Sequence, residues 1–265
     1  MTGAISDSLA LAGRHLRHMV RIPEQMLSMT LMPVAFVLVF GYLFGSSMQV
    51  PGDMTYQEYI MAGIFIQVVL SNLAITALGV VTDLDNGLMD RFRSLPISRA
   101  AVLVGRTTSD LLLVAWSFVI MSVVGLLLGW RTHAHPLSVI AGFGVLLMLA
   151  LAISWLGALL GLTLRNTEAV NAVGTVAMLP MAFLSNAFIP LNGLPQWLRT
   201  VAEWNPVSVV VAACRDLFGN AIPAAGEQAF PMRYPVPMAV GLTVLLLCAV
   251  IPLAIRAFHK SGIPR

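Results

Sequence analysis

The sequence predicts an all-α integral membrane protein with six transmembrane helices, and two observations support this. Hydrophobic residues make up 58% of the 265 residues, charged residues only 10%, and the mean hydropathy is +0.87. A soluble domain carries roughly 25% charged residues, so this chain cannot cover a water-facing surface with polar groups. The second observation is that six apolar stretches approach the roughly 20 residues that cross the hydrocarbon core.

The six predicted spans are separated by short polar or interrupted segments. They run over Thr30–Ser47, Tyr59–Thr82, Leu111–Trp130, Leu137–Leu164, Ala169–Ile189 and Val236–Ile255. The fourth is long enough to tilt or to project beyond the bilayer.

Basic residues in the flanks predict the orientation, because cytoplasmic loops are enriched in Lys and Arg. Eleven of the fifteen Lys and Arg residues fall on the side that holds both termini, and four fall on the other side. Both termini are therefore expected in the cytoplasm. Arg outnumbers Lys fourteen to one, a bias typical of GC-rich bacterial genomes, so we expect a multi-pass protein of a bacterial cell membrane.

Residues 1–28 are predicted to form a cytoplasmic N-terminus with an amphipathic helix. In "SLALAGRHLRHMVRIP", helical spacing gathers Arg14, Arg17 and Arg21 on one face and apolar residues on another. This pattern is typical of a helix lying in the inner membrane interface, where cations meet lipid phosphates. A basic flank that only sets topology is the alternative.

Two interrupted segments lie outside the spans. Residues 83–106 hold three Asp and four Arg within an otherwise apolar chain and are predicted to be cytoplasmic. Residues 190–235 are predicted to form an extracytoplasmic, re-entrant-like helical hairpin. Asn205 suits an N-cap before Pro206, and Gly219 suits a helix stop; Arg199, Glu203, Arg215 and Asp216 are expected to pair locally.

Neutral polar side chains within the fifth predicted span and the second are candidates for a translocation path. Interhelical hydrogen bonds explain the same residues equally well, and both interpretations stay open. Mid-membrane ionisable groups, which ion-driven transporters use, are missing from the predicted spans. The path candidates are Gln67, Ser71, Asn72, Thr76, Asn171, Thr175 and Asn186.

Motifs of enzymes are absent from the sequence. It contains no G-x-x-x-x-G-K-[ST] nucleotide loop, no G-x-S-x-G and no H-E-x-x-H. His133 and His135 have no third ligand nearby, so a surface turn is expected rather than a metal site. We therefore expect no catalytic residue, no cofactor and no metal in this chain, and no nucleic-acid partner.

The stretch "NGLMDRFRSLPISRAAVLVGR" after the second predicted span resembles the cytoplasmic loop of ABC-2 type exporter permeases. The later "FIPLNGLPQWLRTVAEWNPVSVVVAACRDLFG" is similar to the outer hairpin of the same family. Within that family, the sequence looks most like the daunorubicin- and doxorubicin-resistance permeases. The resemblance implies a single transmembrane domain over residues 1–265, with residues 83–106 as its coupling loop.

The family's loop carries a coupling helix that seats in a cleft of the ATPase subunit. Leu88, Phe92 and Leu95 recur at helical spacing and can anchor in a partner's groove, while charged neighbours set the register. A basic loop that serves topology alone is the alternative. The residues that the resemblance assigns to ATPase coupling are Asn86, Gly87, Leu88, Asp90, Arg91, Phe92, Arg93, Leu95 and Pro96.

The resemblance implies partners and a function. The chain is expected to pair with a second copy or a sister permease and to bind ABC ATPase subunits, which would carry ATP and Mg. Embedded in membrane lipid, it would export an amphiphilic drug, secondary metabolite or lipid-like compound from the cytoplasm or inner leaflet. Export of a polysaccharide or lipid-linked glycan is the alternative in the same class; an ATP-independent channel or transporter is the alternative in another.

Overall fold

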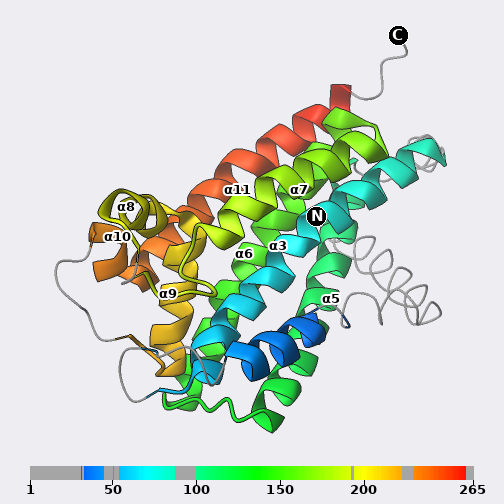
Figure 1. Cartoon of the computed structure of the whole chain (residues 1–265). Coiled ribbons are helices and arrows are strands. Elements are labelled where there is room, and N and C mark those ends of the chain that lie inside the picture. The colour runs from blue at the N-terminus through cyan, green and yellow to red at the C-terminus, as the bar shows by residue number, and fades with distance from the viewer. Residues whose placement is uncertain are drawn as a thin grey trace.

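The computed structural model describes helices and their connections, with no strand among the described residues (Figure 1). These residues are 31, 33–44, 50, 54–86, 99–191, 194–222 and 229–260. A short apolar helix, Pro33–Tyr42, passes into the π-helical turn η1, Phe40–Phe44. The remaining helices are α3 (Tyr56–Asp85), α5 (Arg99–Leu127), α6 (Pro136–Leu164), α7 (Thr167–Phe183), α8 (Gln196–Trp204), α9 (Pro206–Phe218), α10 (Phe230–Arg233) and α11 (Pro235–Lys260).

Local sequence signals determine where several helices begin. Thr55 and Glu58 form a capping box at the start of α3, in which each side chain accepts a hydrogen bond from the other residue's backbone N–H. His135 caps α6 ahead of Pro136, and Asn166 caps α7 by accepting from two backbone N–H groups. These side chains satisfy backbone donors that the first helical turn leaves free.

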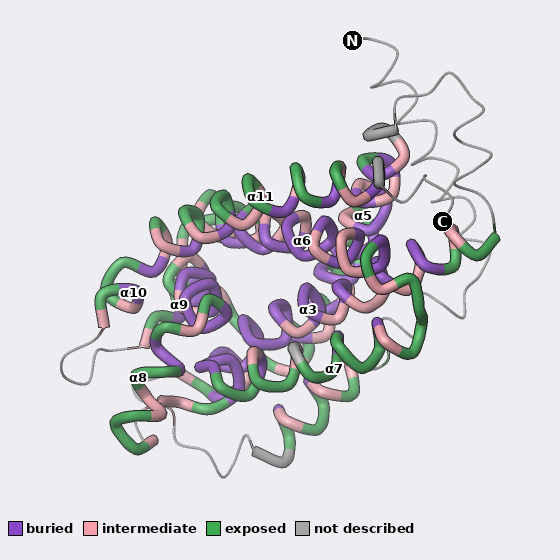
Figure 2. Tube along the Cα trace, turned by 90° about the horizontal axis from the view of Figure 1, so that it is seen from above, coloured by how far each residue is buried: buried purple, intermediate pink, exposed green. Residues whose placement is uncertain are grey.

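Helix α3 lies at the centre of the bundle. It packs along α6 and also touches α5, α7 and α9. Figure 2 shows the buried residues concentrated where α3, α6 and α9 face one another, whereas α7 and α11 expose their outer sides. A cluster of aromatic rings closes the core at the α9 end, where Phe65 contacts the rings of Phe118, Trp130, Phe143 and Phe218 at centroid distances of 5.3–6.1 Å.

Small residues allow α3 and α6 to approach closely. A Cβ atom on Gly157 would lie 2.6 Å from the Leu73 carbonyl oxygen, and one on Gly161 would lie 2.5 Å from the Ala77 carbonyl oxygen. Both distances are shorter than any real carbon–oxygen contact, so only glycine fits there. This Gly-x-x-x-Gly pair therefore acts as the contact surface for α3.

Four of the described helices are long and apolar enough to cross a membrane: Tyr56–Asp85, Val102–Leu127, Pro136–Leu164 and Pro235–Phe258. They contain or largely cover the second, third, fourth and sixth predicted spans. At about 1.5 Å per residue, the 29 residues of α6 extend about 43 Å, beyond the roughly 30 Å hydrocarbon core.

Of the other two predicted spans, the fifth is shorter in the structure and the first is described only in part. The fifth was expected to reach Ile189, but α7 has 17 residues, contains Pro180 and ends at Phe183. Of the first predicted span, the structure describes the helix Pro33–Tyr42 and the π-helical turn η1. Six spans therefore remain a prediction, and the expected interfacial helix within residues 1–28 lies outside the described residues.

Candidate functional sites at the two ends of the bundle

The predicted coupling loop is the part of the chain that connects α3 to α5. Asn86 is the exposed C-cap residue of α3, and its backbone N–H donates to the Thr82 carbonyl oxygen at 3.0 Å. The other assigned coupling residues, Gly87, Leu88, Asp90, Arg91, Phe92, Arg93, Leu95 and Pro96, lie outside the described residues. The apolar stripe through this loop stays a prediction.

A polar cluster joins α3 to α5 where the loop begins and ends. The Arg106 guanidinium lies against Gly79 and forms an ion pair with Asp83 on α3. One turn further along α5, the buried Asp110 accepts a hydrogen bond of 2.7 Å from the Thr76 hydroxyl. These two contacts join the helices on either side of the loop.

The path candidates of the second predicted span face neighbouring helices in part. Asn72 donates to the Ser154 hydroxyl of α6 at 2.7 Å, and Thr76 donates to Asp110 of α5. Ser71 donates to the Gln67 carbonyl oxygen at 2.9 Å, one turn earlier in α3. Two of these four path candidates, Asn72 and Thr76, therefore make interhelical hydrogen bonds, which was the alternative interpretation of the sequence.

The remaining path candidates lie elsewhere. Asn171 and Thr175 are exposed on α7, while Asn186 is buried in the chain segment that follows α7. The path candidates therefore lie in three places. Some contact helices next to α3, two are on the exposed side of α7, and Asn186 is at the end of the bundle that holds α8 and α9. Whether any of them lines a path stays a prediction.

Two short helices follow α7 as expected from Asn205, Pro206 and Gly219. The Asn205 side-chain oxygen accepts from the Val207 N–H at 2.9 Å, and its amide nitrogen donates to the Leu184 carbonyl oxygen at 2.7 Å. Gly219 ends α9 in the left-handed conformation, with φ of 77°. One residue thus caps α9 and ties it to the end of α7.

The expected local pairing of charges is confirmed for one pair and wrong for the other. Arg199 Nε donates to Glu203 Oε1 at 2.7 Å along α8. Arg215, in contrast, makes no ion pair with Asp216 among the described residues, because α9 directs the two side chains differently. Arg215 is buried, with 2% of its surface exposed, while Asp216 is exposed.

The Arg215 side chain reaches across from α9 to carbonyl groups of two other segments. Its Nε and Nη2 atoms each donate to the Tyr59 carbonyl oxygen at 3.0 Å, and Nη2 also reaches the carbonyl oxygens of Asn186 at 2.9 Å and Ala187 at 3.2 Å. The guanidinium lies 3.7 Å from the centre of the Tyr59 ring, a cation–π distance. Burial lowers the pKa of Arg215, yet arginine stays protonated in proteins.

This role of Arg215 was missed from the sequence. The signal was available, because Val211, Arg215 and Phe218 follow helical spacing and share one buried face of α9. The neighbouring Cys214 is also buried, and burial raises the pKa of its thiol to about 12.

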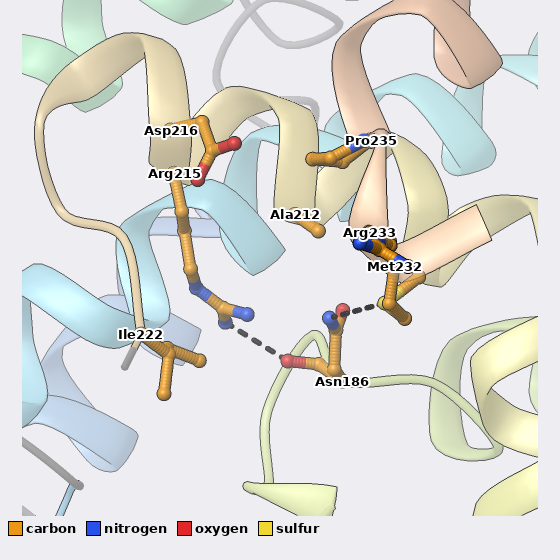
Figure 3. Close-up of a pocket in the computed structure, with 8 residues that line it drawn as sticks. All are labelled: Asn186, Ala212, Arg215, Asp216, Ile222, Met232, Arg233 and Pro235. Atoms are coloured by element: carbon orange, nitrogen blue, oxygen red, sulfur yellow. Dashed lines mark hydrogen bonds between the residues drawn. The ribbon is translucent and has the colours of Figure 1, made fainter. Parts of the chain in front are cut away.

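A cavity of about 230 Å³ opens beside this arginine. Figure 3 shows the Arg215 guanidinium and the Asn186 amide entering the same space from different walls. Partial burial raises the pKa of the Asp216 carboxyl above its usual range, although the side chain reaches solvent. The cavity is lined by Asn186, Ala212, Arg215, Asp216, Ile222, Met232, Arg233 and Pro235.

The turn between α5 and α6 also packs against this end of α9. The His133 N–H donates to the Phe218 carbonyl oxygen at 3.0 Å, and its ring Nε2 lies 2.9 Å from Glu58 Oε1. The Asn220 amide donates to the Arg131 carbonyl oxygen at 3.1 Å. The start of α3, this turn and the end of α9 therefore form one connected end of the bundle.

Comparisons with known proteins place these features in context. Residues 7–218 match the family model described as ABC-2 type transporter. The chain is 31% identical over 216 residues to the daunorubicin resistance ABC transporter permease protein DrrB1 of Streptomyces coeruleorubidus, covering 81% of this chain and 75% of that one. It is 25% identical over 251 residues to the probable doxorubicin resistance ABC transporter permease protein DrrC of Mycobacterium tuberculosis, with coverage of 95% and 88%. It is 23% identical over 222 residues to the putative transport permease ycf38 of Porphyra purpurea, with coverage of 82% and 75%.

Proposed function

The chain belongs to the ABC-2 type transporter family, and from this premise we propose that it is the permease of an ATP-driven exporter. Its family membership and its apolar helices make it a multi-pass membrane permease subunit. The proposed cargo is an amphiphilic drug, secondary metabolite or lipid-like compound, moved out of the cytoplasm or inner leaflet. The observation that supports this choice most directly is the 31% identity to a permease named for daunorubicin resistance.

The energy for export is proposed to come from separate ATPase subunits. This chain is a non-catalytic transmembrane subunit of its family, so ATP and Mg would bind to the partner. The loop between α3 and α5 is the proposed docking element, and the Arg106–Asp83 and Asp110–Thr76 contacts would pass its displacement to both helices. Two permease chains, identical or sister, would complete the exporter.

The proposed orientation puts the loop end in the cytoplasm of a bacterial cell membrane and the α8–α9 end outside. Basic residues of the predicted cytoplasmic flanks support this orientation. The two ends are far enough apart to lie on opposite sides of a membrane, because α3, α6 and α11 run the length of the bundle between them (Figure 1).

The test is ATP hydrolysis by the candidate ATPase in nanodiscs, with and without this chain. Amphiphilic drugs and then lipid-linked sugars are titrated in, and an ATPase lacking its nucleotide-binding lysine is the control for background hydrolysis. We expect the complex to form and drugs to stimulate turnover. Stimulation by lipid-linked sugars alone would favour glycan export, and the absence of both a complex and a change in turnover would favour an ATP-independent channel.

A further inference from the structure

The cavity beside α9 has an excess of positive charge. Two arginines, Arg215 and Arg233, lie on its wall together with one carboxylate, Asp216. Its volume of about 230 Å³ lies below the roughly 300–1,000 Å³ typical of sites for drug-sized ligands. It also exceeds many times the roughly 15 Å³ that a single water requires. The dimensions therefore suit a small polar group better than a whole drug molecule.

Arg215 has unused capacity for an anion. Its hydrogen bonds to described residues go to neutral carbonyl oxygens, those of Tyr59, Asn186 and Ala187. In the part of the chain that the structure describes, no carboxylate forms an ion pair with it, and its buried Nη1 atom has no hydrogen-bond partner. A buried charge without a counter-ion is costly, so an anion in the adjoining cavity would lower the cost of burying this guanidinium.

Asn186 presents a second polar group to the same space. Its Nδ2 atom lies 4.0 Å from the Met232 sulfur, which is a weak acceptor, so this amide N–H can also donate to a stronger one. The amide enters the cavity opposite the guanidinium, as Figure 3 shows. An oxygen-rich anion in the cavity can therefore accept a hydrogen bond from the Asn186 amide while it lies near the charge of the guanidinium.

The surroundings of the cavity indicate where such a group comes from. Trp197, Trp204, Phe230 and Tyr234, on α8, α10 and the adjoining residue, have exposed fractions of 70%, 60%, 60% and 49%. Exposed aromatic rings of this kind gather at the membrane–water interface, at the level of the lipid headgroups. From these rings we infer that the cavity lies at the membrane–water interface, where lipid phosphates are concentrated.

We propose that this cavity binds the phosphate of an anionic membrane lipid. Arg215 and Arg233 are its charge partners and the Asn186 amide is a hydrogen-bond donor. The site is separate from the coupling loop and requires no assumption about the exported cargo. Lipid bound there would join α9, α10 and the start of α11 to the surrounding leaflet.

The test uses the full chain in detergent, with lipid binding followed by native mass spectrometry. Phosphatidylglycerol is expected to bind more tightly than phosphatidylcholine. Arg233→Gln should weaken phosphatidylglycerol binding roughly fivefold, the effect of one basic residue near an anionic surface. Arg131→Gln is the matched control, because Arg131 is also exposed at this end of the bundle but does not line the cavity, and it should leave the affinity unchanged.

Two further variants act without removing the buried arginine. Asp216→Asn removes the negative charge from the wall and should tighten phosphatidylglycerol binding, whereas Ala212→Leu fills part of the cavity and should weaken it. Equal affinities in the wild type, Arg233→Gln and Asp216→Asn would overturn the proposal. Displacement of the lipid by millimolar inorganic phosphate would show a site for free phosphate and would overturn the lipid assignment.

Discussion

At the scale of single residues, Arg215 is the described charged side chain whose hydrogen bonds do most to join separate parts of the bundle. It joins α9 to the first turns of α3 through Tyr59 and to the segment after α7 through Asn186 and Ala187. The planar guanidinium carries several N–H donors and can reach several carbonyl oxygens at once. The ammonium group of lysine, at the end of a flexible side chain, does this less well. One side chain therefore ties together segments more than 150 positions apart in the sequence.

Replacing Arg215 should destabilise the protein strongly. Arg215→Ala leaves three buried carbonyl oxygens without this donor, and a buried group that loses its partner costs about 1–3 kcal/mol. We expect a loss of at least about 3 kcal/mol and a clear fall in the melting temperature of the purified protein in detergent, with Arg215→Lys intermediate. Arg131→Ala, at an exposed site, is the control; a wild-type melting temperature for Arg215→Ala would contradict the bridging role.

At the scale of helices, the contact between α3 and α6 depends on glycine at two positions. Gly157 and Gly161 face backbone carbonyl oxygens of α3, whereas Gly144 on the same helix has open space around it. The sequence contains several Gly-x-x-x-Gly pairs, and nothing in their spacing distinguishes those that touch another helix. The structure identifies this pair as a packing surface.

The same substitution should therefore have opposite effects at two glycines of α6. Gly157→Ala places a Cβ against the Leu73 carbonyl oxygen and should cost about 1–3 kcal/mol through overpacking. Gly144→Ala meets no neighbour and should be neutral or stabilising by up to about 1 kcal/mol, because alanine favours the helix. Thermal unfolding of both variants in the same detergent measures the difference; equal melting temperatures would argue against close α3–α6 contact.

The loop between α3 and α5 makes a second prediction about an element. If Leu88, Phe92 and Leu95 form a docking stripe, Leu88→Asp and Phe92→Asp should leave membrane insertion intact and weaken ATPase binding at least tenfold, since each buries a charge in an apolar groove. Met89→Asp, off the stripe by about 100°, is the matched control. Pull-down of the ATPase from membranes provides the measurement, and undiminished capture by both stripe variants would exclude this coupling helix.

At the scale of the whole molecule, the two ends of the bundle differ in kind. One end carries the loop, the Arg106–Asp83 pair and the exposed junction at Arg165; the other carries α8, α9, the cavity and exposed aromatic residues. The apolar helices between them form the boundary between two aqueous sides. The proposed orientation assigns the first end to the cytoplasm.

Single cysteines can test this orientation. In a variant lacking Cys214 and Cys248, we expect Gln196→Cys on α8 to react with a membrane-impermeant maleimide in intact cells. Glu168→Cys at the start of α7 should react only after the membrane is permeabilised, because both side chains are exposed but lie at opposite ends. The reverse labelling pattern would invert the orientation and move the cavity to the cytoplasmic face.

Features that depend on local chemistry and on composition could be predicted from the sequence alone. An apolar run has to be a helix in lipid, because its backbone has no other partners there, and Asn205, Pro206 and Gly219 mark their helix ends through interactions within a few residues. The family resemblance was also available from local motifs, and the comparisons confirm it.

Which polar groups meet, and where α7 ends before the predicted residue, became clear only from the packed helices. Arg215 and Asp216 are neighbours in sequence, yet α9 buries one and exposes the other, and the partners of Arg215 come from two distant segments. At the early end of α7, the Leu184 carbonyl oxygen likewise accepts a hydrogen bond from Asn205, 21 positions later in the chain. These contacts join residues far apart in the chain, and their energies arise only after the helices have packed, so no local pattern encodes them.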